Sequence, residues 1–495
     1  MIRRRKTGKL FLGAIMVVAL IGLCVFFGVQ WFTKTGIFRI PGVVYYDDSL
    51  SDNERQILSE IFTEDLELDK DVTISAEYSL SRPELQEGQY IYNIWLPTTD
   101  FYSLDTNIDA TDAELLFADA YESEVAFTMT PFDELTNSRK LLSINGKYYP
   151  DEFDSGAVFR VIRFESDDFE DEIKPLIHDK FAKDWPSKDS VLTFAQTGVT
   201  AMSRGMNAKL YAVNDPKYFS QNIAPFLSGF DLTHTSNESS FTDYASSDNI
   251  CSDPRFIDTL LDIGLDIVEL TGNHNGDCGS EAAIQSVDTY NEKGIKTVGG
   301  GKNADEAAKP LNISEKNNNI TLLAYNLSTG GATTGDNPGA NQYYEESATA
   351  DIKSAKERGD FVIVDIQYYE CSAYVSEYED PTCDRADSAA GDQVGFFRHL
   401  IELGADVVVG TSAHQPQTFE LYGDGVIYYG LGNLFFDQYW WPGTTRSLVL
   451  AHYFYDGKLL QTKVVPTVYD ATMQTKLLDE ETSKWFLQRL ISVKP

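Results

Sequence analysis

Apolar side chains form an unbroken run near the N-terminus of the chain. Residues 10–29 carry no charge, and about 20 such residues are enough to cross the hydrocarbon core of a bilayer as a helix. Trp31 and Phe32 follow the run and suit the membrane–water interface. The pattern predicts a transmembrane anchor over residues 10–32, preceded by a cytoplasmic basic segment over residues 1–9.

The basic residues before this run predict its orientation. Arginine and lysine flanks stay in the cytoplasm, and here they are Arg3, Arg4, Arg5, Lys6 and Lys9. We therefore expect a single-pass protein of the cell membrane, with the bulk of the chain on the extracytoplasmic side. A cleaved signal peptide is the alternative, because its charged and apolar regions look the same. The lack of a small-residue cleavage site after the run favours the anchor.

Between residues 38 and 188 short β-branched and aromatic runs alternate with acidic loops. Residues 72–80, 90–97 and 158–165 have the composition of strands. Residues 53–66 place apolar side chains at helical spacing. The pattern predicts a smaller α+β extracytoplasmic domain over residues 38–188, which we interpret as a spacer or interaction module.

The pattern of apolar and polar residues changes after residues 184–188, which have the composition of a linker. Strand-like runs now alternate with helical ones, among them helices near residues 216–228 and 280–293. Such alternation predicts an α/β domain with a mostly buried sheet, here over residues 189–446. Chemistry in these domains lies on loops at the carboxyl ends of strands. We expect residues 447–495 to be a C-terminal extension that packs on this domain.

Composition excludes one class of partner. The chain has 40 Lys and Arg against 76 Asp and Glu, a formal net charge of −36, and 42% of its residues are hydrophobic. That apolar content is too high for a disordered chain and supports a folded one with several domains. An acidic body repels phosphate backbones, so we expect no nucleic-acid partner.

Cysteine usage agrees with export. Cys24 lies in the apolar run, which leaves Cys251, Cys278, Cys371 and Cys383, an even number for an oxidising compartment. Four cysteines allow three pairings, and the pairing of nearest neighbours, Cys251 with Cys278 and Cys371 with Cys383, closes the shortest loops. Unpaired thiols are one alternative. Zinc ligation is another, which the missing CxxC pair disfavours.

Polar side chains gather where predicted strands end. Asn273 and His274 follow a hydrophobic strand that ends at Gly272, and an amide beside an imidazole can reach one metal or phosphate. The pair alone is weak evidence. Its companions at other predicted strand ends are His234, Glu238, Gln367, Glu370 and His414.

Four segments, in this order, resemble the successive motifs of the poly-γ-glutamate capsule synthesis (CapA) family: LTGNHNGDCG, GIKTVGGGKNADEAAKP, ADVVVGTSAHQPQ and YYGLGNLFFDQ. The resemblance covers about residues 191–438. It implies an α/β fold of the calcineurin-like metallophosphoesterase type, a two-sheet sandwich flanked by helices. The smaller α+β domain and the N-terminal transmembrane helix would precede this CapA-like domain.

What the resemblance implies for the site depends on each position. Gly272, Asn273 and His274 match the family's Gly-Asn-His step, and His414 stands at its last imidazole position. The first strand, where capsule relatives often have a Gly-Asp motif, contains no carboxylate over residues 197–204. The first metal-bridging group is therefore missing.

Further positions depart from the family pattern. Gln367 stands where a histidine is common, and Thr411 and Ser412 replace possible imidazoles before His414. A two-metal centre needs bridging carboxylates, so the dinuclear ligand set is incomplete. The resemblance implies at most one divalent cation, Mn or Zn, whose candidate ligands are Glu238, Asn273, His274 and His414.

Other residues are candidates for binding or catalysis around this site. His274 and Asp277 are the candidate catalytic groups for a metal-dependent hydrolase. The pocket could equally bind an anion without any chemistry. His234 has a plainer interpretation as a loop histidine hydrogen-bonded to a nearby carbonyl. The candidate ligand-binding residues are Arg204, His234, Gln367 and Asn433.

The leading functional hypothesis is a membrane-anchored CapA-like protein in the biosynthesis, transport or attachment of a capsule polymer such as poly-γ-glutamate. Its expected partners are the lipid bilayer, through the N-terminal helix, and the extracellular anionic polymer or its synthesis complex. One alternative is a metal-dependent phosphoesterase or amide hydrolase. The other is a non-catalytic binding or scaffold protein with a degenerate metallophosphoesterase pocket.

Overall fold

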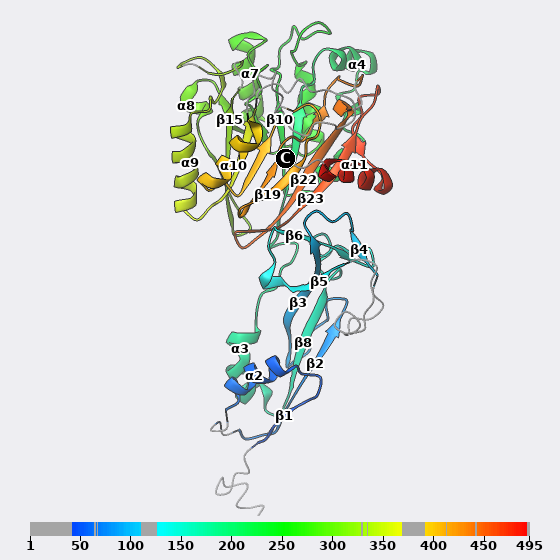
Figure 1. The fold of residues 1–495 in the computed structure, drawn as a ribbon, viewed down its shortest axis with the longest axis vertical. Coiled ribbons are helices and arrows are strands. Elements are labelled where there is room, and N and C mark those ends of the chain that lie inside the picture. The colour runs from blue at the N-terminus through cyan, green and yellow to red at the C-terminus, as the bar shows by residue number, and fades with distance from the viewer. Residues whose placement is uncertain are drawn as a thin grey trace, which may run out of the picture. The chain divides into compact units, whose positions relative to one another are not determined.

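The computed structural model describes residues 42–492, apart from 64–65, 67, 110–125, 328–329, 334, 369–391, 412 and 441–442. The described part of the chain forms two compact units (Figure 1), divided at Trp95/Leu96, Ala157/Val158 and Trp185/Pro186. The predicted basic segment and anchor, residues 1–32, lie outside the described residues. None of the helices within the described part is both long and apolar enough to span a membrane.

The first unit is a small sheet covered by helices, the α+β composition that the sequence predicts. Its core contains Leu58, Ile74, Ile162 and Phe164, all buried. The sheet has the order β1-β2-β8-β3, with β1 (Val44–Tyr46), β2 (Val72–Ser79), β8 (Val158–Glu165) and the first part of β3 (Gln89–Asp100); its helices are α2 (Asp52–Ile61), the π-helical turn η3 (Phe169–Ile173) and α3 (Lys174–Phe181).

Helix α2 begins where local chemistry places it. The Ser51 side chain accepts from the backbone N–H of Glu54, and the Glu54 carboxylate accepts from the backbone N–H of Ser51, which forms a capping box. Glu54 also binds Arg160 of β8 in a buried ion pair at 2.7 Å. The helix ends at Ile61, earlier than the predicted residue 66.

The second unit is built on two large sheets, in the part of the chain that the structure describes. The first has the order β12-β11-β10-β9-β22-β23-β24, with β21 beside β9, and the second has the order β14-β15-β17-β18-β20-β19. Strands β9 to β12 run parallel, as do β15, β17, β18 and β20. The strands of the first sheet are β9 (Leu192–Thr200), β10 (Leu232–Asn237), β11 (Ile267–Glu269), β12 (Lys296–Val298), β21 (Asn433–Phe435), β22 (Arg446–Tyr455), β23 (Lys458–Val468) and β24 (Lys476–Leu477); those of the second are β14 (Leu311–Glu315), β15 (Asn318–Asn326), β17 (Phe361–Gln367), β18 (Val407–Gly410), β19 (Phe419–Tyr422) and β20 (Gly425–Tyr428).

The two sheets pack face to face as a sandwich. One buried cluster joins Phe194 and Ile267 of the first sheet to Leu322 and Ile363 of the second. Helices cover the outer faces: α4 to α7 share a core with the first sheet, and α9 and α10 share one with the second (Figure 1). The helices of this unit are α4 (Gly205–Val213), α5 (Ala224–Leu227), α6 (Ile257–Asp262), α7 (Gly279–Glu292), α8 (Ala304–Ala307), α9 (Glu345–Glu357), α10 (Gln393–Leu403) and α11 (Glu480–Ser492), with 3-10 turns at Pro216–Tyr218, Pro254–Phe256 and Gly443–Thr445.

The C-terminal residues are not an extension packed on a finished domain, as the sequence analysis expected. Strand β22 lies between β9 and β23, where Val449 pairs with Thr197 and Leu448 with Pro466. Nearly every residue of β22 is buried, and a strand that is buried on both faces belongs in the middle of a sheet. The segment after residue 446 therefore supplies central strands of the sandwich.

A segment between the two halves of the first unit also belongs to the second unit. Residues 96–109 and 126–157 group with it by their contacts, although the sequence predicts them in the domain over residues 38–188. Their strands are β4 (Asn107–Ile108), β5 (Thr128–Pro131), β6 (Arg139–Leu141) and β7 (Ser143–Ile144), with a 3-10 turn at Phe132–Glu134; the short β13 (Gly300–Gly301) and β16 (Gly339–Ala340) complete the unit.

Candidate functional site

Strand ends from both sheets bring predicted site residues together. Glu238 follows β10 of the first sheet, and Gln367 ends β17 of the second. The Gln367 Nε2 donates to Asn273 Oδ1 at 3.0 Å and lies 3.4 Å from Glu238 Oε1. Glu238 and Gln367 are buried, whereas Asn273 is half-buried. We call Glu238, Asn273, Gln367, His414 and Asn433 the strand-end cluster.

The imidazole of His414 completes this cluster. Its Nδ1 lies 2.9 Å from Asn433 Oδ1, and the Asn433 Nδ2 donates to the Thr444 carbonyl at 3.2 Å. Because the Asn433 oxygen can only accept, we assign a proton to Nδ1. The other ring nitrogen, Nε2, lies 3.9 Å from Glu238 Oε2.

Arg204 lies next to the strand-end cluster, separated from it by one aromatic ring. Its guanidinium is 4.8 Å from the centre of the Phe436 ring, and that ring is 5.2 Å from the His414 ring. Asp437 accepts from the Arg204 Nη2 at 2.5 Å and from the backbone N–H of Gly205 at 2.9 Å. Arg204 was a predicted ligand contact, whereas Phe436 was not predicted. A phenylalanine within an apolar run gives no sign of a site.

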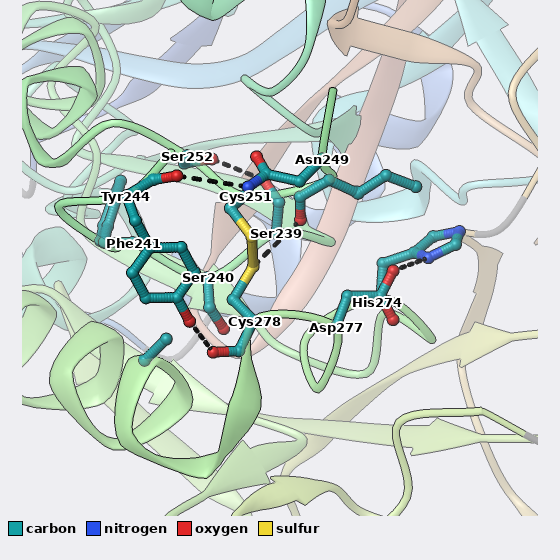
Figure 2. Close-up of a disulfide and its surroundings, with 12 residues drawn as sticks. Ser239, Ser240, Phe241, Tyr244, Asn249, Cys251, Ser252, His274, Asp277 and Cys278 are labelled. Carbon is teal, nitrogen blue, oxygen red and sulfur yellow. Dashed lines mark hydrogen bonds and ion pairs between the residues drawn. A yellow bond between two sulfur atoms is a disulfide. The ribbon is translucent and has the colours of Figure 1, made fainter. Parts of the chain in front are cut away.

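His274 and Asp277, the predicted catalytic groups, form a pair. The His274 Nδ1 lies 2.8 Å from Asp277 Oδ2 on one turn (Figure 2). His274 is half-buried and Asp277 is exposed. An imidazole oriented by a carboxylate can accept a proton from a reacting group, so the pair has the geometry of a general base.

Asn275, which sequence reasoning missed, holds the loop that carries this pair. Its Nδ2 donates to the carbonyls of Asn237 and Leu270 at 3.1 and 3.0 Å. Its own carbonyl accepts from the Ser240 hydroxyl at 2.7 Å. A buried asparagine whose side chain satisfies two backbone carbonyls is a positioning residue. Its place two residues after the strand-end Asn273 is the signal that could have found it.

A disulfide braces the same loop. The structure pairs Cys251 with Cys278, as predicted, across 27 residues and with a Cα–Cα distance of 5.9 Å. Cys278 directly follows Asp277 and precedes α7 (Figure 2). The second predicted pair, Cys371 with Cys383, lies outside the described residues, as does Glu370.

His234 lies deeper, between the two sheets. Its side chain is fully buried, with Nε2 3.2 Å from Asp365 Oδ2, and Asp365 also accepts from the Gln196 amide at 2.6 Å. The structure thus places His234 in a polar layer of the sandwich core, four residues before Glu238 in the chain. The interpretation as a loop histidine is wrong, because the residue lies within β10.

Burial shifts the pKa of two groups in this layer. The carboxyl of Glu269 has its pKa raised to about 7, first by burial and then by the charge of Asp365. The pKa of His452 is lowered to about 3, mainly because burial disfavours the imidazolium. His452 is therefore neutral at physiological pH.

The described residues do not fit the predicted Mn or Zn site. Within them, no group of three or more His, Cys, Asp and Glu side chains is placed to hold a cation. The strand-end cluster offers one carboxylate and one imidazole, while its other donors are amides, and zinc sites are built mainly from His, Cys and acidic ligands.

Comparison with known proteins places this chain among capsule synthesis proteins. The family model described as "Bacterial capsule synthesis protein PGA_cap" matches residues 177–438. "Capsule biosynthesis protein CapA" of Bacillus anthracis is 22% identical over 263 residues, which cover 50% of this chain and 61% of that protein. "PGA biosynthesis protein CapA" of Bacillus subtilis is 26% identical over 200 residues, covering 40% of this chain and 49% of that protein.

A mycobacterial protein with a related name is also similar to this chain. A "probable polyglutamine synthesis accessory protein" of Mycobacterium tuberculosis is 24% identical over 194 residues, covering 37% of this chain and 48% of that protein. The chain thus spans about half the length of these relatives, up to 61% for the Bacillus anthracis protein. Because the family model covers more than half of the sequence, the chain belongs to the bacterial capsule synthesis family PGA_cap.

Proposed function

We propose that this chain is a membrane-anchored, extracytoplasmic accessory protein that binds a capsule polymer such as poly-γ-glutamate during its synthesis, transport or attachment. Its membership of the PGA_cap family supports a role in capsule formation. The apolar run over residues 10–29 and the Cys251–Cys278 pair support the location.

The two-sheet sandwich is, in this proposal, a calcineurin-like metallophosphoesterase fold whose metal centre has degenerated into a binding site. The position of the strand-end cluster supports this interpretation. The strand-end cluster lies at the carboxyl ends of parallel strands in both sheets, where such domains hold their ligands. Amides stand there beside a single carboxylate and a single imidazole, so the site retains polar groups without a full ligand set.

The observation that carries the proposal is the amide chemistry of the strand-end cluster. Asn273 and Gln367 carry amide groups of the same chemistry as the amide links of a γ-glutamyl chain, and here the two side chains hydrogen-bond to each other. A polyanion is repelled by a body of net charge −36 unless a cation attracts it locally. Arg204 supplies a positive charge beside the cluster, although Asp437 neutralises part of it.

Binding of a γ-linked glutamate oligomer to the purified full chain tests this function. We expect binding that a chelator leaves unchanged and that Asn273→Ala weakens at least fivefold, since it removes both the half-buried amide and its contact with Gln367. Asn291→Ala, on an exposed position of α7, is the matched control and should bind like the parent chain. Equal affinity of the two variants would rule out the strand-end cluster as the polymer site.

A second candidate is an amide hydrolase or phosphoesterase, favoured by the His274–Asp277 pair. It predicts turnover of a γ-glutamyl amide or a generic phosphodiester, lost in His274→Ala and reduced in Asp277→Asn. Substrate turnover that is the same in His274→Ala as in the parent chain would eliminate this pair as the catalytic base. A complete absence of turnover over a screen of divalent metals would eliminate hydrolysis as the function.

A further inference from the structure

A cavity lies in the same unit as the strand-end cluster and shares no residue with it. Its volume is about 380 Å³, within the range of roughly 300 to 1,000 Å³ that small-molecule sites occupy. The walls come from residues 101–106 and 140–148, from β19 and β20, from β23 and from α11. Figure 1 shows α11 beside β22 and β23 at the edge of the sandwich.

Most of the wall of this cavity is hydrocarbon. Phe101 packs edge to face on Phe419 at 5.9 Å between ring centres, and both line the cavity. Leu141, Leu487 and Ile491 add aliphatic surface. A ligand with an apolar body would be stabilised here by about 25 cal/mol for each Å² of apolar surface removed from water.

The charges at the cavity oppose the charge of the whole chain. Among the described residues that line it, Lys140, Lys463 and Lys484 face one acid, Glu480, although the chain has almost twice as many acidic as basic residues. Lys463 lies 3.5 Å from Asp151 and over the Tyr148 ring. Amines thus outnumber acids in the lining, although Glu480 and the neighbouring Asp151 balance part of their charge, and we call this site the lysine cavity.

Lys140 is the most constrained of these amines. Its Nζ donates to the Ser103 carbonyl at 2.8 Å. The pKa of Lys140 is lowered to about 8, chiefly by burial, while Asp105 raises it and Lys484 lowers it to a smaller degree. Lys140 and Lys484 line the same cavity, so a carboxylate bound there would be attracted by both amines.

We propose that the lysine cavity binds a small amphiphilic anion, a carboxylate carried on an aryl or alkyl body. The carboxylate pairs with Lys140 and Lys484, and the apolar body lies against Phe101, Phe419 and Leu487. This activity goes beyond polymer binding and does not depend on it. A γ-glutamyl chain fits less well, because it has polar amide links and no apolar body to match the walls.

Calorimetric titration of the full chain in dodecyl maltoside tests this proposal with 4-phenylbutyrate as the probe. The uncharged 4-phenylbutan-1-ol and γ-linked diglutamate are the comparison ligands. We expect saturable binding of 4-phenylbutyrate and at least fivefold weaker binding of both others. Lys484→Met, alone or combined with Lys140→Met, should weaken the binding of 4-phenylbutyrate at least fivefold. Lys353→Met, on an exposed position of α9, should leave that binding unchanged.

A variant that keeps both amines guards against a loss of folding. Leu487→Trp should fill the cavity and abolish binding of 4-phenylbutyrate while the thermal unfolding midpoint stays near that of the parent chain. The proposal is overturned if the alcohol binds as tightly as the carboxylate, if diglutamate binds more tightly than 4-phenylbutyrate, or if Lys353→Met weakens binding as much as Lys484→Met. The proposal is also overturned if Lys484→Met loses binding only because it is unfolded, while the folded Leu487→Trp binds 4-phenylbutyrate as well as the parent chain does.

Discussion

At the scale of single residues, Gly272 determines how closely two strand ends approach. A Cβ on this residue would lie 2.6 Å from the Glu238 Cα, closer than real contacts allow, so a larger residue would push the Asn273 loop away from Glu238. We expect Gly272→Ala to lower the free energy of unfolding by about 2 kcal/mol and to weaken γ-glutamyl binding. Urea unfolding and the binding titration measure the two effects.

The same loop offers a matched control for that substitution. A Cβ on Gly276 would meet no atom within 4 Å, so Gly276→Ala should change neither stability nor binding. If both variants lose stability equally, the close approach of Gly272 to Glu238 is not the cause.

Glu269 should make stability depend on pH. Its folded pKa of about 7 lies above the ordinary value of 4.5, so its contribution to stability is fully present below pH 4.5 and is lost as the pH rises through 7. Glu269→Gln removes the cost of burying a charged carboxylate above pH 7 and preserves the shape of the side chain. We expect the free energy of unfolding of the variant to exceed that of the parent chain by about 3 kcal/mol at pH 8 and by little at pH 4.5.

Urea unfolding at several pH values measures the Glu269 effect. Glu292→Gln, at an exposed position at the end of α7, is the control. Its difference in stability from the parent chain should not change with pH in this way. A stability difference between Glu269→Gln and the parent chain that stays constant from pH 4.5 to 8 would contradict the assignment.

At the scale of elements, the disulfide links the loop after β10 to the start of α7. In the loop-entropy model, closing a loop of this length contributes about 3 kcal/mol. We therefore expect Cys251→Ser, Cys278→Ser and the double variant to lose stability by the same amount, because each removes the same bond. Thiol labelling of the unfolded, unreduced parent chain should leave both cysteines unmodified, and labelling of either would contradict the bond.

Local patterns predicted several elements well and one poorly. Strand β8 spans the predicted residues 158–165, and α7 starts and ends within one residue of the predicted helix over residues 280–293, because short apolar periodicities determine such elements. The place of β22 was not predictable in this way. Its apolar run is equally compatible with an edge of the domain or the middle of a sheet, and only pairing with β9 decides between them.

At the scale of the whole molecule, the proposed anchor predicts how the chain behaves in cells. We expect the full chain to sediment with membranes, to resist extraction by high salt and to be released by detergent, because about 20 apolar residues bind a bilayer strongly. A variant that lacks residues 1–32 should stay in the supernatant. Release of the full chain by salt alone would contradict an anchor and favour a peripheral association.

The sequence by itself determined the mixed α/β composition, the family and most of the polar residues at strand ends, because apolar periodicity and short motifs are local. Only the tertiary structure decided which of them meet. Glu238 and Gln367 are 129 residues apart in the chain, yet their side chains lie 3.4 Å apart, whereas His234, only four residues from Glu238, faces Asp365 in the core. Such contacts depend on strand register and on the packing of two sheets, which many weak interactions set together and no short window contains.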